Sequence, residues 1–129
     1  SQDILHLMFL GQPTVWAVER REDGRLMGSI GLIGDGARQY GSAKSLGYAL
    51  GTAYWGRGYM TEAVRAVTRF GFEKMMLDLI SATCYPDNLR SRRVLEKCGF
   101  VYEGTLHRAE LLFNGEVRDH LHFYLPHLK

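Results

Sequence analysis

The chain has 129 residues, of which 46% are hydrophobic and 23% charged, a composition typical of one globular domain. Its formal net charge of +2 is too small a bias to indicate a nucleic-acid partner. No apolar run approaches the roughly 20 residues that cross a bilayer, and no signal peptide is visible, so we expect no membrane partner. Cys84 and Cys98, the only cysteines, lack the spacing of a zinc or redox motif and predict reduced, partly buried thiols in a cytoplasmic protein.

The first half of the chain predicts three strands. Breaker and turn residues separate three strand-like runs: Val15 to Arg20, Leu26 to Ile33 and Leu46 to Gly51. Gly11-Gln12-Pro13 is the breaker before the first run, and Glu22-Asp23-Gly24 is typical of a hairpin turn between the first two. Gly34 to Ser45 contains three glycines and several polar residues, which favours a loop.

Helical and strand patterns alternate in the middle of the chain. Tyr59 to Lys74 is predicted to be a helix, because apolar residues recur at the spacing of one buried face: Met60, Ala63, Val64, Val67 and Phe70. Leu77 to Tyr85 is strand-like. Pro86-Asp87-Asn88 is typical of a helix start, and we expect that helix to run to Cys98. Gly99 then ends it in a left-handed conformation.

Two final strands are predicted around a hairpin turn. Phe100 to Phe113 and Val117 to Leu125 flank Asn114-Gly115, which is a strong hairpin signal. The predicted order is therefore β-β-β-α-β-α-β-β. This order favours an α/β fold, with a mixed, strongly twisted sheet and helices packed on it.

The segment Trp55-Gly56-Arg57-Gly58-Tyr59-Met60-Thr61 joins a predicted strand to a predicted helix. The first N–H groups of a helix lack internal partners and carry partial positive charge, and glycines let the backbone approach an anion closely. The arrangement predicts a phosphate site, to which Arg57 and the Thr61 hydroxyl add donors. Taken alone, Gly-x-Gly before a helix is a weak signal of a phosphate site and is more often just a tight turn.

Two motifs together resemble the GNAT superfamily of N-acetyltransferases. Gly47-Tyr48-Ala49-Leu50, followed by the Trp55 to Thr61 loop, looks like that superfamily's acetyl-CoA loop. The segment from Asn88 to Phe100 is similar to its Asn-x-x-Ser…Lys-x-Gly-Phe helix. The segment Phe100 to Leu106, with Asp119 downstream, resembles the branch that acetylates ribosomal-protein N-termini. The resemblance covers about Val15 to Leu125 and implies one GNAT domain over residues 1–129.

The resemblance implies a mechanism and a set of binding residues. The third and fourth predicted strands are expected to splay apart at a bulge, and the pantetheine arm of acetyl-CoA to bond main-chain groups of Tyr48, Ala49 and Leu50. The loop from Trp55 through Thr61 is expected to hold the pyrophosphate: Trp55, Gly56, Arg57, Gly58, Tyr59, Met60 and Thr61. Asn88 is expected to bond the pantetheine arm and Ser91 to lie near the sulfur as the catalytic hydroxyl. No metal is implied.

The chain also departs from the superfamily pattern. Trp55 replaces the usual Gln or Arg, and Met60 the usual Gly or Ala. Leu95 stands where many members have a tyrosine acid, and Ser45 where the branch often has a glutamate. The usual N-terminal strand and two helices are expected to be missing, since Ser1 to Leu10 has room for at most the tail of the second helix.

Further polar residues have two interpretations each. His120 and His122 share a face of a predicted strand, more typical of a wet surface than of a metal site. The helix from Asn88 carries three arginines: Arg90, Arg92 and Arg93. The sequence agrees equally well with their contact with the cofactor's 3′-phosphate and with a solvated face of the helix. Asp119 alternates with apolar residues, which predicts an inward carboxylate with a structural partner, or else a substrate role.

The sequence therefore predicts transfer of acetyl from acetyl-CoA to an amine. A protein or peptide N-terminal α-amine is the leading acceptor. Such amines have a pKa of roughly 7.7–8.0 against about 10.4 for lysine, and no catalytic carboxylate is obvious, with Glu103 and Asp119 the residual candidates. A polyamine, antibiotic or amino acid as acceptor, and a non-catalytic acetyl-CoA-binding module, remain alternatives, and a homodimer is left open.

Overall fold

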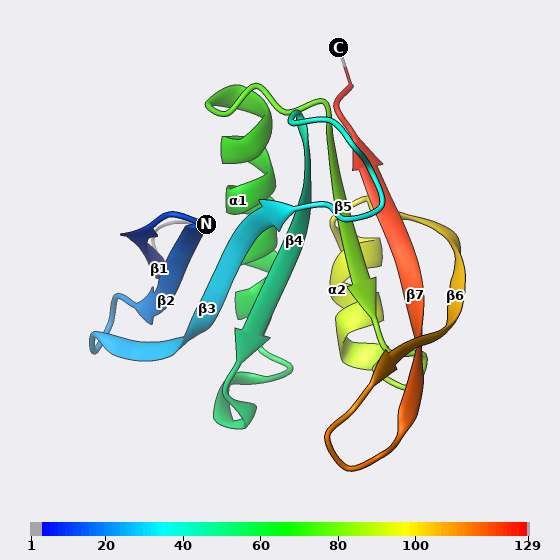
Figure 1. Ribbon diagram of the computed structural model, residues 1–129. Helices are drawn as coiled ribbons and strands as arrows, with labels where there is room; N and C mark the ends of the chain where they lie inside the picture. Colours follow the sequence, from blue (N-terminus) through cyan, green and yellow to red (C-terminus); the bar gives the residue numbers. More distant parts are fainter. Residues whose placement is uncertain (1–3, 129) are drawn as a thin grey trace.

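The computed structural model describes residues 4–128, which form a seven-stranded sheet with two helices behind it (Figure 1). The strand order is β1-β2-β3-β4-β5-β7-β6, and all neighbours are antiparallel except the parallel pair β4–β5. In chain order the elements are β1 (Leu5–Gly11), β2 (Thr14–Arg20), β3 (Arg25–Gly34), β4 (Ala43–Leu50), a 3₁₀ helix (Thr52–Tyr54), α1 (Tyr59–Glu73), β5 (Leu79–Cys84), α2 (Leu89–Lys97), β6 (Val101–Leu111) and β7 (Val117–Pro126). Neither α1 nor α2 has the length and apolarity of a membrane-spanning helix.

The turn glycines adopt the conformations that the sequence predicts. Gly24, Gly99 and Gly115 have φ values of 68°, 89° and 90°, which residues with a Cβ adopt at a cost. Gly24 lies in the β2–β3 turn, Gly115 in the β6–β7 turn, and Gly99 directly after the end of α2. The predicted strands and helices from residue 15 onward are all present, with ends shifted by a few residues.

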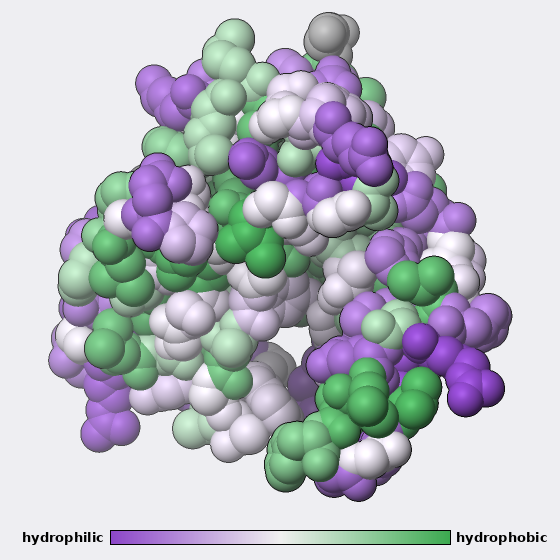
Figure 2. Space-filling view, viewed as in Figure 1, coloured by the Kyte–Doolittle hydropathy of each residue, from purple (hydrophilic) through white to green (hydrophobic). Residues whose placement is uncertain are grey.

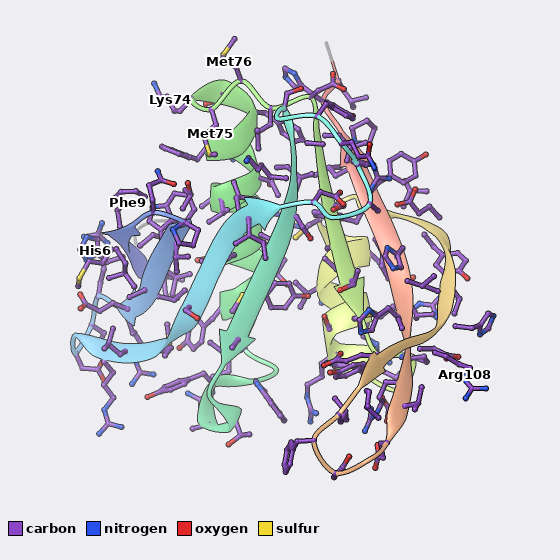
Figure 3. All side chains as sticks on the ribbon, in the orientation of Figure 1. His6, Phe9, Lys74, Met75, Met76 and Arg108 are labelled. Atoms are coloured by element: carbon purple, nitrogen blue, oxygen red, sulfur yellow. The ribbon has the colours of Figure 1, made fainter. Side chains whose placement is uncertain are left out.

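The N-terminal segment differs from the prediction. Residues 5–11 form strand β1, antiparallel to β2, where at most the tail of a helix was expected; Ser1 to Asp3 lie outside the described residues. The breaker Gly11-Gln12-Pro13 is part of the turn that joins these two strands, rather than the end of an unrelated segment. Figure 3 labels Phe9 on this edge strand, where its ring packs edge-to-face on Trp16 of β2 at 5.8 Å.

The core lies between the sheet and the two helices. Met60, Ala63, Val64 and Val67 of α1 are buried, as their helical spacing predicts. Phe70, predicted on the same face, is 40% exposed. It packs at the border of the core, edge-to-face on Trp16 at 5.3 Å. Leu95 of α2 and the sheet residues Ile30, Ile80 and Phe123 are among the side chains closed off completely.

Strands β4 and β5 separate halfway along their length. They pair from Ala43/Leu79 to Leu46/Ala82, and pairing stops there, although β4 stays paired with β3 as far as Leu50. The predicted splay is therefore present, but the bulge is not, since neither the β3–β4 nor the β4–β5 register shifts. Figure 2 shows the surface hollowed between the two halves of the sheet. The half of β4 from Gly47 to Leu50 thus keeps one free edge.

Close contact between β3 and β4 holds that free half of β4 in place. A Cβ on Gly28 would overlap the carbonyl oxygen of Ala49, a backbone atom that cannot turn aside. We expect Gly28→Ala to lower the free energy of unfolding by roughly 1–3 kcal/mol, the cost of overpacking. Gly34→Ala is the matched control on the same strand, because nothing lies within 4 Å of its Cβ position. Denaturant titration yielding equal stabilities for the two variants would contradict this reading of the contact.

Candidate functional site

The loop from Trp55 to Thr61 begins α1 with unpaired amides. Gly56 and Gly58 have φ values of 77° and 80°, and Gly58 caps the helix without a side-chain hydrogen bond. The first intrahelical bond runs from the Glu62 N–H to the Gly58 carbonyl, at 3.1 Å. The amides before it have no intrahelical partner, and they lie at the positive end of the helix dipole. This geometry suits an anion such as a phosphate.

A cavity of about 810 Å³ opens between this loop, the free half of β4 and the start of α2. Its walls are formed by Tyr48, Ala49, Leu50, Tyr54, Trp55, Gly56, Gly58, Tyr59, Met60, Thr61, Tyr85, Asp87, Asn88, Arg90, Ser91, Arg93, Val94 and Lys97. Every residue that the sequence predicts to bind the cofactor belongs to this lining, with the exception of Arg57. The guanidinium groups of Arg20 and Arg57 both lower the pKa of the Tyr59 phenol, which places Arg57 near this hydroxyl.

Trp55 and Arg90 close one end of the cavity. The Trp55 indole N–H donates to the Leu50 carbonyl at 2.8 Å, so it folds back over the end of β4. The Arg90 guanidinium lies 4.5 Å from the centre of the indole ring, a cation–π contact that joins α2 to the loop. These contacts explain why a tryptophan is accommodated at a position where the superfamily usually has a polar side chain.

Main-chain groups of β4 face the gap between β4 and β5. The Gly51 N–H donates to the Met27 carbonyl of the neighbouring chain segment at 2.8 Å. Because hydrogen-bonding direction alternates along a strand, Tyr48 and Leu50 direct their N–H and C=O groups to the other side, toward β5. The Leu50 carbonyl is occupied by Trp55. The groups of Tyr48 and the Leu50 N–H therefore remain for a ligand in the cavity.

Asn88 has a structural role that is separate from the predicted contact with the cofactor. Its Oδ1 accepts from the Ser91 N–H at 3.1 Å, so it caps α2, in line with the predicted helix start. Capping uses one acceptor oxygen and leaves the Asn88 side-chain NH₂ group for a ligand. The side chain therefore both starts the helix and fixes the position of Ser91.

Ser91 shares a hydrogen bond with the tyrosine of β4. The Tyr48 hydroxyl lies 2.7 Å from Ser91 Oγ and 3.2 Å from the Ser91 carbonyl oxygen. Burial raises the pKa of Tyr48 to about 12, against a smaller lowering by the Ser91 hydrogen bond. The phenol therefore keeps its proton at neutral pH. The sequence predicts Tyr48 only as a source of main-chain contacts, so its hydroxyl beside Ser91 is a feature that sequence reasoning missed.

The three arginines of α2 divide between the two interpretations. Arg90 and Arg93 line the cavity. Arg92 does not belong to the lining and instead pairs with Glu96 at 3.3 Å and lies 5.9 Å from the Tyr102 ring centre. Two of the three guanidinium groups are thus available to an anionic ligand, and the third belongs to the solvated side of the helix.

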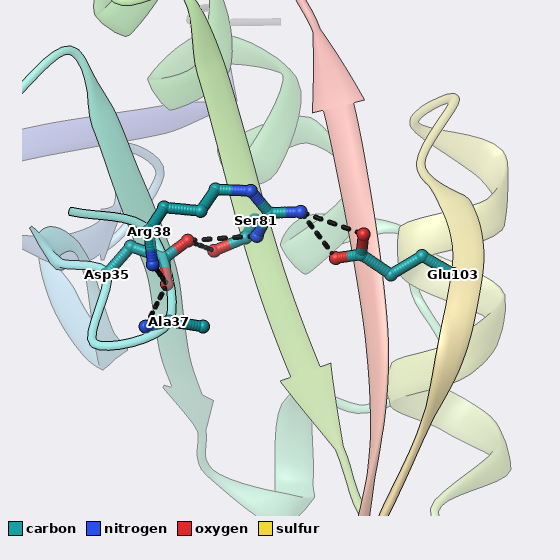
Figure 4. A network of polar contacts seen from close by, with 5 residues as sticks. All are labelled: Asp35, Ala37, Arg38, Ser81 and Glu103. Atoms are coloured by element: carbon teal, nitrogen blue, oxygen red, sulfur yellow. Dashed lines mark hydrogen bonds and ion pairs between the residues drawn. The ribbon is translucent and has the colours of Figure 1, made fainter. Parts of the chain in front are cut away.

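The carboxylates suspected from the sequence are both engaged elsewhere. Glu103 receives two hydrogen bonds from Arg38, at 2.6 and 2.8 Å, and Arg38 also holds Asp35, which in turn accepts from Ser81 (Figure 4). This network fastens the β3–β4 loop across β5 to β6. It is a structural network, and Glu103, bonded to Arg38 through both oxygens, does not belong to the cavity lining.

Asp119 is not buried among apolar residues, as its alternation had predicted. Its side chain is 37% exposed, since the β6–β7 hairpin extends beyond the core. It accepts from the Arg108 N–H at 2.8 Å and lies 3.1 Å from His107. Arg108 has a φ of 54° at an irregular point of β6, and Figure 3 shows its side chain directed away from the sheet. Asp119 therefore has structural partners, as the first interpretation predicts, and they lie at the irregular point of β6.

A third polar cluster was not anticipated. Tyr85, a residue of the cavity wall, donates its hydroxyl proton to Glu110 at 2.9 Å, and His120 Nε2 lies 2.9 Å from the same carboxylate oxygen. Arg118 covers the Tyr85 ring at 4.8 Å. The residues come from β6, β7 and the position directly after β5, so only the sheet topology brings them together. A polar aromatic residue directly before Pro86-Asp87-Asn88 was the one available sequence signal.

Comparison with known proteins gives the family. Residues 3–101 match the model of the acetyltransferase (GNAT) domain. The chain is 44% identical over 100 residues to the probable N-acetyltransferase YjcK of Bacillus subtilis, covering 76% of this chain and 53% of that protein. It is 37% identical over 76 residues to the ribosomal protein uS5-alanine N-acetyltransferase of Escherichia coli, covering 59% and 39%.

A solved structure agrees with these sequence matches. The ribosomal-protein-S5-alanine acetyltransferase from Vibrio fischeri superposes with a TM-score of 0.78 at 25% identity, over 97% of this chain and 63% of that one. The chain spans about half the length of the first curated relatives it matches. The match over residues 3–101 and the shared fold agree on one conclusion, that the chain belongs to the GNAT acetyltransferase family.

Proposed function

We propose that this chain binds acetyl-CoA and transfers its acetyl group to a primary amine, with a protein or peptide N-terminal α-amine as the acceptor. The observation that carries the proposal is the cavity itself. It combines a glycine loop at a helix start, a strand edge with free main-chain groups and a pair of half-buried, hydrogen-bonded hydroxyls. These are the three kinds of contact that a pyrophosphate, a pantetheine amide chain and a leaving thiolate require.

The residues present fit the phosphate end of acetyl-CoA. The Cβ positions of Gly56 and Gly58 have nothing within 4 Å, so a ligand can approach the loop backbone directly. The N–H groups at the start of α1 would bind the pyrophosphate. Arg90 and Arg93, which also line the cavity, would contact the remaining phosphate, since guanidinium groups suit phosphate oxygens.

The fit extends along the strand edge to the hydroxyl pair. The main-chain groups of Tyr48, the Leu50 N–H and the Asn88 side-chain NH₂ would hold the pantetheine amides. Acetyl-CoA supplies an activated thioester, whose carbonyl carbon the acceptor amine attacks. Ser91, in contact with the neutral Tyr48 phenol, would donate a proton to the departing sulfur. A thiol has a pKa of roughly 8.5, so a hydroxyl pair is a sufficient donor.

The choice of acceptor has support from relatives and from amine chemistry. The Escherichia coli relative is named for acetylation of a ribosomal-protein alanine. At neutral pH an α-amine with a pKa of roughly 7.7–8.0 is already partly neutral, whereas neutral lysine is on the order of one part in a thousand. Glu103 and Asp119 are held by Arg38 and by Arg108 with His107, so neither is a free base for a lysine.

An acceptor comparison tests the proposal. At about pH 7.5, where only the α-amine is substantially neutral, we expect a lysine-free peptide with a free N-terminal alanine to be acetylated faster than an N-blocked peptide with one lysine. Spermidine is included as a third acceptor. Mass spectrometry of the three products measures the outcome. Faster acetylation of the blocked lysine peptide or of spermidine would contradict the proposed acceptor class.

A further inference from the structure

The two faces of the sheet differ at the cleft between β4 and β5. Cys84 and its cross-strand partner Leu121 are buried on the face that α2 covers. Thr83 and its partner His122 lie on the opposite face, and His120, two residues along β7, shares that face. No helix of residues 4–128 covers this second face (Figure 1). An amine that approached a thioester between β4 and β5 from this second face would pass the histidines, below the β3–β4 loop that Asp35 fastens to Ser81.

On this face one histidine is held by a carboxylate. The Glu110 Oε1 atom lies 2.9 Å from His120 Nε2 and 2.9 Å from the Tyr85 hydroxyl. Hydrogen bonds from His120 and Tyr85 lower the pKa of Glu110, so the carboxylate is ionised and acts as an acceptor. An acceptor at Nε2 fixes the imidazole proton there and leaves the Nδ1 lone pair free. Among the described residues no hydrogen-bond partner of His120 Nδ1 is found.

From this geometry we propose that His120 is the base that takes the proton from the acceptor amine, and that Glu110 positions it. The inference rests on the proposed acetyl transfer. Tyr85 joins the pair to the wall of the cavity, since its ring lines the cavity and its hydroxyl holds Glu110. The arrangement supplies the base for which the sequence offers no candidate, and it uses a side chain whose ordinary pKa is close to neutral.

The proton and electron balance is complete without another reactant. The acceptor ammonium gives one proton to His120 Nδ1, and the amine lone pair then forms the new C–N bond at the thioester carbonyl. The C–S bond breaks, and the sulfur takes a proton from the Ser91–Tyr48 hydroxyl pair. The second amine proton restores that pair, and solvent removes the first from His120. The net products are the amide, the free thiol and one proton.

Three further groups lie around the His120–Glu110 pair. His122 lies on the same strand with its ring centre 6.4 Å from that of His120. Arg118 covers Tyr85 and adds a positive charge near Glu110. The Tyr85 phenol donates to the carboxylate, which raises its own pKa, so it stays neutral. The charged groups of the cluster are the Glu110 carboxylate and the Arg118 guanidinium, and Arg118 also pairs with Glu116 and Asp87.

The test is a pH profile of kcat/KM for acetylation of a lysine-free peptide with an N-terminal alanine. We expect His120→Gln to lower kcat/KM by about 10- to 100-fold at neutral pH, the scale of general-base assistance. The loss should shrink above about pH 8, where the α-amine is neutral without help. Glu110→Gln should shift the acid limb of the profile. The controls are His107→Gln on the same hairpin and Glu19→Gln on β2, the same changes at residues whose ion-pair partners, Asp119 and His6, lie outside the cluster.

The outcomes separate this inference from the proposed function. If His120→Gln lowers kcat/KM equally at every pH, the loss indicates a packing defect and overturns the assignment. The assignment is also overturned if only His122→Gln changes the pH profile. If His120→Gln keeps wild-type activity, the assignment of His120 as the base is wrong, whereas the proposed acetyl transfer is unaffected. A wild-type chain that gains thermal stability from acetyl-CoA yet acetylates no amine overturns both.

Discussion

Gly58→Asp should abolish the stabilisation of this protein by acetyl-CoA, whereas Gly58→Asn should keep most of it. Gly58 has a φ of 80° and nothing within 4 Å of its Cβ position, and Asp and Asn both tolerate this left-handed region better than other residues. The two side chains match in size and differ in charge. Only the aspartate would place a negative charge at the pyrophosphate site. There it would repel the pyrophosphate and lie next to the unpaired amides of α1.

Thermal unfolding with and without acetyl-CoA measures this effect. A ligand that binds only the native state stabilises it by about 2.7 kcal/mol at 100 times its Kd, which corresponds to several degrees in Tm for a chain of this size. We expect this shift in the wild type, a smaller shift in Gly58→Asn, and none in Gly58→Asp. An undiminished shift in Gly58→Asp would place the pyrophosphate elsewhere.

The second large effect concerns the hydroxyl pair. Ser91→Ala should lower kcat by about 10- to 1,000-fold, the range of proton-transfer assistance, with acetyl-CoA affinity nearly unchanged. Tyr48→Phe should lower kcat in the same direction, because the Tyr48 hydroxyl lies 2.7 Å from Ser91 Oγ. The reason is that the departing thiolate would lose its nearest proton donor. Single-turnover kinetics with acetyl-CoA and the peptide acceptor measure the step.

Two further variants control this prediction. Ser91→Thr keeps a hydroxyl and should recover part of the rate that Ser91→Ala loses. Tyr40→Phe makes the same change as Tyr48→Phe at an exposed loop position and should have no effect. Full activity in Ser91→Ala would assign the serine to the hydrogen-bonded start of α2 alone.

Local features of the fold could be predicted because they depend on neighbouring residues. Asn114-Gly115 specifies its turn through the left-handed glycine. Asn88 caps α2 through its own side chain, and Gly56 and Gly58 supply the positive φ values that the loop requires. For the same reason the residues predicted to bind the cofactor, which two short motifs carry, line the cavity with the exception of Arg57.

Features that depend on distant contacts could not be predicted. β1 exists because β2 offers it an edge, which the local signal at Gly11-Gln12-Pro13 does not reveal. Asp119 alternates with apolar residues along its strand, as an inward-facing residue would. The strand nevertheless extends beyond the helices, which leaves the Asp119 side chain half-exposed. Tyr85, Glu110 and His120 meet only because β7 lies between β5 and β6, an order that strand prediction alone does not give.

The central claim is that the cavity between β4 and α2 supports acetyl transfer, and release of free CoA thiol tests it most directly. The 129-residue chain would be incubated with acetyl-CoA and, separately, with the alanine peptide, the blocked lysine peptide and spermidine. We expect thiol release that depends on the acceptor, is fastest with the alanine peptide and matches the acetylated product in amount. Binding of acetyl-CoA without thiol release for any acceptor would contradict the claim and identify the chain as a binding module.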